Sequence, residues 1–227
     1  AESLCNLASI YYELGRLEDS VISYQNAIKM KVNLTEAYSN LGKALHDLNR
    51  LEEAEEKCKY AIKTKPDFTQ AHYNLGNILI SQHRYEDSIV SFKEAIKLNP
   101  TYSEAFYNLG NIYQELGKFD DSEIMFRKAI SLKPDFALAI FSLSKVLNYN
   151  DDPKIILQLL EDVMSIDPNF IGLRAGVFLA ILKFLEGNIV ECKNYLILVI
   201  KIQEKQFQIL RNEKIYHRYL MKLVEWH

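Results

Sequence analysis

Apolar residues in the first part of the chain recur with a period of about 3.6 residues, which is typical of amphipathic helices. One such stripe comprises Leu75, Ile78 and Leu79. A second stripe follows at Ile89, Phe92 and Ile96. Mainly polar residues occupy the positions between them. The pattern predicts two consecutive amphipathic helices, each with one face in a hydrophobic core.

The helix pair is repeated every 34 residues, in four regular units: 1–34, 35–68, 69–102 and 103–136. The sixth place of each unit is an asparagine: Asn6, Asn40, Asn74 and Asn108. The eighth and twentieth places hold small residues in every unit, and the twenty-fourth holds an aromatic residue in all but the second. Small residues let two helices approach closely, and an aromatic ring fills the space beside them.

The turns and the helix ends carry their own signals. The links between the two helices of a unit are Gly15-Arg16, Asn49-Arg50, His83-Arg84 and Gly117-Lys118. Glycine and asparagine readily adopt the left-handed conformation that ends a helix. The second helices are followed by prolines at Pro66, Pro100, Pro134 and Pro168. Proline disfavours helical geometry in the residue before it, so we expect each second helix to stop there.

The repeat becomes irregular in the second half of the chain. Residues 137–170 form a degenerate fifth unit, with Ser144 and Ile156 at its eighth and twentieth places. Gly187-Asn188 is the expected turn of a shifted sixth unit, 171–204. The array is therefore expected to continue beyond the regular units.

The last stretch, 205–227, contains neither proline nor glycine. We expect it to form a long helix that caps the last apolar face, because a solenoid needs such a cover. Its apolar side chains could also form an exposed strip for weak homo-oligomerisation. They are Tyr216, Tyr219, Leu220, Leu223 and Trp226.

The order of small, aromatic and proline places resembles the tetratricopeptide-repeat family. The first unit departs from it, with Val32 at the proline place. The resemblance implies an all-α fold, a right-handed superhelical α-solenoid of about six helix-turn-helix units with a C-terminal capping helix. It also implies that the first helices line a concave face, where an extended peptide or a partner protein would bind.

That face should be polar, aromatic and nearly uncharged. Its candidate peptide-binding residues are Asn6, Asn40, Tyr73, Asn74, Asn77, Tyr107, Asn108, Asn111 and Gln114. An asparagine amide both donates and accepts hydrogen bonds, so it can pair with a ligand backbone whatever the ligand's sequence. The four sixth-place asparagines would follow about ten residues of extended chain. Alternatively, they are consensus residues satisfied by solvent or by a neighbouring backbone group.

The run of asparagines and the segment 105–113 are similar to the repeats of O-linked N-acetylglucosamine transferases over residues 1–136. This similarity implies a second hypothesis beside a non-catalytic interaction scaffold. The chain would be the substrate-recognition arm of a larger enzyme, with the catalytic domain outside it. A dicarboxylate clamp for acidic chaperone tails is absent, because lysine is missing from the fifth places: Cys5, Ser39, Tyr73 and Tyr107.

Composition disfavours some classes of function and location. The 227 residues are 48% hydrophobic with a formal net charge of −3, which predicts one soluble elongated domain and disfavours nucleic-acid binding. No stretch approaches the ~20 apolar residues that span a bilayer, and no signal peptide is evident. We expect a cytoplasmic location. Because Ala1 already stands at the first place of a repeat, we also expect the chain to be part of a longer protein.

Catalytic and metal sites are not expected. The three cysteines, Cys5, Cys58 and Cys192, have no paired spacing and are expected to be reduced core residues. The histidines form no helical ligand pair, and no phosphate-binding loop or nucleophile motif is present. Acidic pairs such as Asp120-Asp121 stand at helix starts, which favour negative charge. The sequence thus predicts no enzyme activity within this chain and no cofactor.

Overall fold

The structure, a computed structural model, describes residues 1–30, 34–147 and 153–166 and separate positions between 175 and 201. These residues form ten α-helices and no strands, which confirms the predicted all-α class for the described part. The chain divides into two compact units, Ala1–Leu132 and Lys133–His227.

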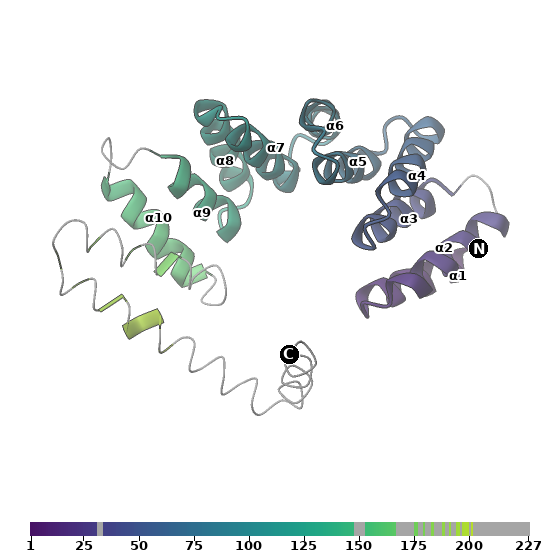
Figure 1. Cartoon of the computed structure of the whole chain (residues 1–227), viewed down its shortest axis with the longest axis horizontal. Coiled ribbons are helices and arrows are strands. Elements are labelled where there is room, and N and C mark those ends of the chain that lie inside the picture. Colours follow the sequence, from purple (N-terminus) through teal and green to yellow (C-terminus); the bar gives the residue numbers. More distant parts are fainter. Residues whose placement is uncertain are drawn as a thin grey trace. The chain divides into compact units, whose positions relative to one another are not determined.

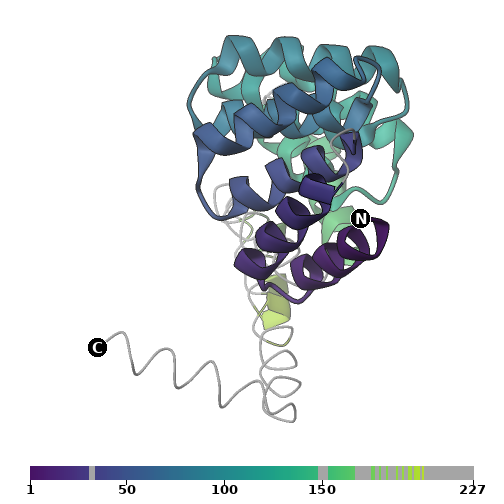
Figure 2. The same ribbon diagram turned by 90° about the vertical axis from the view of Figure 1, so that its right-hand side faces the viewer.

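The first unit consists of four helix pairs in chain order (Figure 1). They are α1 (Glu2–Glu13) with α2 (Leu17–Met30), α3 (Thr35–Asp47) with α4 (Leu51–Thr64), α5 (Thr69–Ser81) with α6 (Tyr85–Leu98), and α7 (Ser103–Glu115) with α8 (Phe119–Leu132). The two helices of each pair pack against each other, and each second helix also packs against the next first helix. Figure 2 shows these helices from the side, joined by short connections.

The turn inside each pair is built by the backbone alone. Its central residues have positive φ angles: 72° at Gly15, 59° at Asn49, 58° at His83 and 72° at Gly117. In the first turn the amide of Gly15 donates to the carbonyl of Tyr12 (2.9 Å), and that of Arg16 to the carbonyl of Tyr11 (2.8 Å). This pair of bonds is a Schellman motif, and it recurs in the other three turns. The predicted turn residues are confirmed.

The second helices α4 and α6 stop just before a proline, as predicted. Lys65, before Pro66, has φ −140° and ψ 91°. Asn99, before Pro100, has φ −134° and ψ 92°. Both conformations are extended, because the proline ring excludes helical geometry in the preceding residue.

Glycine at the eighth place permits close contact between the helices of a pair. A Cβ atom at Gly76 would lie 2.8 Å from the ring of Phe92, and one at Gly110 would lie 2.7 Å from the ring of Phe126. In the second unit a Cβ at Gly42 would lie 2.5 Å from the sulfur of Cys58. The twenty-fourth place therefore fills the space that the glycine leaves, as predicted.

The small residue at the twentieth place has a second role that the sequence pattern did not indicate. The hydroxyl groups of Ser20, Ser88 and Ser122 each donate a 2.8 Å hydrogen bond to the carbonyl of the eighth-place residue. All three serines are fully buried. The second repeat has Ala54 at this place and lacks the bond.

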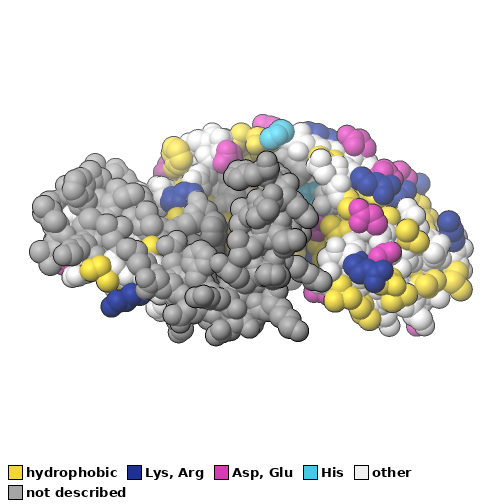
Figure 3. Space-filling model, turned by 60° about the horizontal axis from the view of Figure 1, so that its bottom comes forward, with side chains coloured by type: hydrophobic (Ala, Val, Ile, Leu, Met, Phe, Trp, Pro, Cys, Tyr) yellow, Lys and Arg dark blue, Asp and Glu magenta, His cyan; other side chains and the backbone are white. Residues whose placement is uncertain are grey.

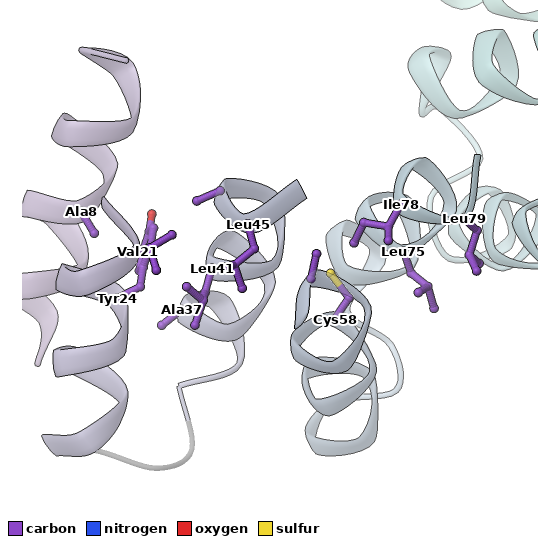
Figure 4. Close-up of a cluster of buried hydrophobic side chains, with 12 residues drawn as sticks. Ala8, Val21, Tyr24, Ala37, Leu41, Leu45, Cys58, Leu75, Ile78 and Leu79 are labelled. Carbon is purple, nitrogen blue, oxygen red and sulfur yellow. The ribbon is translucent and has the colours of Figure 1, made fainter. Parts of the chain in front are cut away.

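The core of the first unit lies between successive helices (Figure 4). Val21 and Tyr24 of α2 face Leu41 and Leu45 of α3, and all four are at most 3% exposed. Cys58 is wholly buried beside them, and burial raises its pKa to about 12. Its thiol is therefore a neutral core group, in agreement with the sequence prediction.

The second unit contains α9 (Ala137–Val146) and α10 (Pro153–Ile166), which pack against each other. The buried residues Leu143 and Leu160 belong to their shared core. The predicted sixth repeat is described only at separate positions. The predicted capping helix, 205–227, lies outside the described residues, as do Val32, Pro168 and Cys192.

Candidate functional site

The first helices of the pairs form one layer in the first unit. α3 contacts α5, and α5 contacts α7, in addition to the contacts within each pair. Among the described helices, the second helices do not pack against one another in this way. The first helices therefore lie closer to one another than the second helices do. This inner layer is where the candidate binding residues were expected.

A pocket of about 470 Å³ opens on the inner layer where α3, α5 and α7 meet. Its lining residues are Lys43, His46, Asp47, Gln70, Tyr73, Asn74, Asn77, Tyr102 and Glu104. A smaller pocket of about 150 Å³ lies between α1, α2 and α3, and Tyr12, Tyr24 and Asn40 are among its lining residues. The inner layer thus offers two recesses along successive repeats.

Hydrogen bonds link side chains of the larger pocket to one another and to the preceding repeat. The Tyr102 hydroxyl donates to the side-chain oxygen of Gln70 (3.2 Å), and the Gln70 amide donates to Asn74 (2.9 Å). Asn74 donates to the hydroxyl of Ser39 (3.0 Å) and to its backbone carbonyl (3.2 Å). Such a network fixes the rotamers of the pocket side chains.

Two stacked tyrosines contribute the flat surface of this pocket. The ring centroids of Tyr73 and Tyr102 lie 4.7 Å apart with an interplanar angle of 29°. Burial raises the pKa of both hydroxyls, and at Tyr73 this outweighs the lowering by hydrogen bonds from Asn77 and Asn108. Both rings therefore stay neutral near pH 7 and can donate or accept hydrogen bonds.

The sixth-place asparagines join successive repeats. Asn74 bonds to Ser39, and Asn108 donates to the hydroxyl of Tyr73 (3.2 Å) and to the side-chain oxygen of Asn77 (2.8 Å). Ser39 and Tyr73 are the fifth-place residues of the preceding repeats. Asn74 is only 4% exposed. Its amide is thus used inside the array, and contact of these asparagines with a peptide stays a prediction.

The remaining predicted residues are more dispersed. Asn6 is exposed on α1, and Asn40 forms a hydrogen bond with Tyr24. The ring of Tyr107 packs beside that of Phe126, with centroids 5.9 Å apart. Asn111 and Gln114 are half-buried on α7 and do not line the 470 Å³ pocket. The pocket brings together Tyr73, Asn74 and Asn77 from the predicted set.

The pocket is more charged than the predicted strip, because Lys43, Asp47 and Glu104 line it. Lys43 and Glu104 stand at the ninth and second places of their repeats, on the same kind of helix as the predicted binding residues. The predicted set contains only amide and tyrosine side chains, so the expectation of a nearly uncharged face is corrected here. Tyr102 had no comparable signal, because it lies in the connection before α7.

Two other features bear on the class of function. In the described part of the chain, no group of three or more His, Cys, Asp or Glu side chains could hold a metal ion. No helix among the described residues combines the length and the apolar character needed to cross a bilayer.

Comparison with protein families identifies the repeat. Models described as TPR repeat match residues 8–49 and 76–117, and models described as tetratricopeptide repeat match 35–68 and 103–136. The chain contains tetratricopeptide repeats. The matched units coincide with the second and fourth predicted repeats, 35–68 and 103–136. Among curated protein sequences, none is similar enough to match the chain.

Solved structures of tetratricopeptide-repeat (TPR) proteins share the fold. PilF of Pseudomonas aeruginosa has a TM-score of 0.76 and 16% identity, with 97% of this chain and 96% of PilF covered. MamA of Desulfovibrio magneticus RS-1 has a TM-score of 0.63 and 20% identity, with 73% and 93% covered. YrrB, a TPR protein with an unusual peptide-binding site, has a TM-score of 0.57 and 20% identity, with 76% and 89% covered. At these identities the similarity establishes the fold alone.

Proposed function

We propose that this TPR chain is a non-catalytic scaffold that binds an extended segment of a partner protein on the inner layer of its first unit. The observation that carries the proposal is the 470 Å³ pocket, which is lined by residues of three successive first helices and contains stacked tyrosines and side-chain amides. Amides supply donors and acceptors for a peptide backbone, and tyrosines supply flat contact area at low entropic cost.

The spacing of the repeats suits an extended ligand. Packed helices lie ~10 Å apart, and an extended chain advances ~3.3 Å per residue, so each repeat would meet about every third ligand residue. The two pockets on the inner layer belong to neighbouring repeats, as such a periodic contact requires. The hydrogen-bond network also lowers the ordering cost of binding, because the pocket side chains are already held in place.

The hypothesis of a recognition arm of a larger, transferase-like enzyme would use the same inner layer. It places the chemistry outside this chain, and it stays a prediction. Sequencing of the gene beyond the codon for His227 would separate it from the scaffold: a nucleotide-sugar-binding domain favours the arm, and a stop codon favours the scaffold.

Binding to an array of diverse extended peptides tests the proposal, with Asn77→Ala as the groove variant. Asn77 lines the pocket, whereas Asn26 is exposed on α2 and provides the matched control Asn26→Ala. We expect Asn77→Ala to weaken the best peptides about three- to tenfold, as for loss of one or two interface hydrogen bonds. Unchanged binding by Asn77→Ala, or equal loss in both variants, would show that the pocket is not the binding site.

A further inference from the structure

Basic residues of the first unit are divided unevenly between its two kinds of helix, because the second helices carry eight and the first helices only one. The first helices, α1, α3, α5 and α7, carry one basic residue, Lys43, and six acidic residues. The acidic residues are Glu2, Glu13, Glu36, Asp47, Glu104 and Glu115. Glu13, Asp47 and Glu104 line the two pockets of the inner layer. The first helices therefore carry more acidic than basic residues, although Lys43 lines both pockets and His46 lines the larger one.

Several acidic residues of the second helices form salt bridges within the chain. Arg16 pairs with Asp19 at 2.6 Å, and Arg50 pairs with Glu53 at the same distance. Arg84 repeats the arrangement in the third unit. Figure 3 shows basic and acidic side chains next to each other on the right-hand part of the molecule. On the first helices, Asp47 lies 3.1 Å from Nδ1 of His46, and Glu13 and Glu115 form no salt bridge with another described residue.

Lys43 shows how tyrosine rings and carboxylates of the inner layer can hold a cation. The ammonium nitrogen of Lys43 lies 4.4 Å from the centroid of the Tyr12 ring. The hydroxyl of that ring donates a hydrogen bond to Asp47. A tyrosine face next to a carboxylate attracts a cation through both the ring quadrupole and the charge. In the larger pocket the stacked Tyr73 and Tyr102 lie beside Glu104 and offer the same combination.

We propose that the inner layer of the first unit selects extended segments rich in lysine or arginine, with one basic side chain in the pocket formed by Tyr73, Tyr102 and Glu104. This inference rests on the proposed peptide-binding function and adds the chemistry of the ligand. Charge complementarity favours a basic partner over a neutral or acidic one, and it excludes acidic tails. The carboxylates also steer the partner to the groove by long-range attraction.

Fluorescence anisotropy with three labelled peptides tests this inference. Each peptide has about ten residues, with Gly and Ser as spacers and with Lys, Gln or Glu at every third position. We expect the Lys peptide to bind the wild-type chain at least about tenfold more tightly than the Gln peptide, and the Glu peptide not to bind. Binding of the Lys peptide should weaken as salt rises from ~0.05 to ~0.5 M, because the Debye length shortens.

Two groove variants and one control locate the interaction. Glu104→Gln and Asp47→Asn remove charge from the pocket but keep hydrogen-bonding atoms, so helicity and melting should be retained. Each should weaken the Lys peptide about three- to tenfold, in the range of partly exposed charge pairs. Glu86→Gln removes an exposed charge from the second helix α6 and should leave binding within about twofold.

The outcomes separate the two levels of the proposal. Equal binding of the Lys and Gln peptides, both weakened by Asn77→Ala, would overturn the preference for basic segments and leave the peptide groove in place. Equal weakening by Glu104→Gln and Glu86→Gln would also overturn it, because attraction to the whole acidic chain would then explain the result. If Asn77→Ala left the binding of both peptides unchanged, the proposal that the inner layer is the peptide-binding groove would be wrong.

Discussion

At the residue scale, Glu55 shows how side chains couple neighbouring repeats. Its carboxylate, on α4, accepts hydrogen bonds from Arg84 (2.9 Å) and Gln82 (3.0 Å) of the next repeat. Lys59 approaches it to 2.6 Å on its own helix. The side chain is only 12% exposed, so these interactions are less screened by water than those of the other surface pairs.

The ionisation of Glu55 should therefore contribute to stability. Desolvation acts to raise its pKa, but the hydrogen bonds from Lys59, Gln82 and Arg84 lower it from 4.5 to about 2. Because the folded pKa is the lower one, the stabilisation is complete above pH ~4.5 and is lost as pH falls toward ~2. It amounts to at most about 3.5 kcal/mol at neutral pH, since one pKa unit corresponds to ~1.4 kcal/mol.

Urea unfolding of Glu55→Gln at several pH values checks this. At pH ~7 the variant should be less stable than wild type by about 1–3 kcal/mol, and the difference should shrink as pH is lowered toward ~3. Glu56→Gln, at a neighbouring position with 70% of the side chain exposed, should change stability by less than about 0.5 kcal/mol. A deficit of Glu55→Gln that is equally large at both pH values would contradict the role of its charge.

At the element scale, the serine at the twentieth place joins the two helices of a repeat. Ser88→Ala should cost about 0.5–1.5 kcal/mol, because it removes a buried hydrogen bond to the carbonyl of Gly76. The second repeat allows the reverse change: Ala54→Ser places a hydroxyl at the equivalent position and should gain a similar bond. Urea unfolding measures both changes. Destabilisation by both variants, or by neither, would mean that the hydroxyl does not contribute.

The same scale shows what the sequence could and could not predict. Helix pairs, turns at Gly15 and Gly117, and the close approach at Gly76 follow from local preference and steric size, which a 34-residue pattern records directly. The partners of the polar groups do not follow from it. Periodicity places Asn74 on the inner layer, but its amide bonds to Ser39, a residue of the previous repeat. Such a choice depends on the distance between repeats, which no single repeat encodes.

The charge of the inner layer could have been predicted from the sequence by counting charged residues separately for the first and the second helices. The net charge of −3 describes the chain as a whole, and it hides the contrast between first and second helices. Assigning Glu104 and Asp47 to first helices already places them on the ligand side. Counted by helix type, one basic residue on the first helices against eight on the second would have predicted a groove poor in positive charge.

At the scale of the whole molecule, the chain divides into Ala1–Leu132 and Lys133–His227. In a solenoid, stability is roughly the sum of repeat stabilities and nearest-neighbour interfaces, so damage to one repeat should not spread through the whole array. The core of α9 and α10 provides a place to test this, because Leu160 is fully buried there. Leu160→Ala should cost about 2–5 kcal/mol within the second unit.

Hydrogen exchange measured by mass spectrometry follows both units at once. In Leu160→Ala we expect faster exchange in α9 and α10 and unchanged protection in α1 to α6, the helices farthest along the chain from the change. Leu41→Ala, at a residue only 1% exposed in α3, should give the opposite pattern. Loss of protection in α1 to α6 on substitution of Leu160 would instead make the chain one cooperative unit. Peptide binding by the first unit would then depend on residues that lie outside its groove.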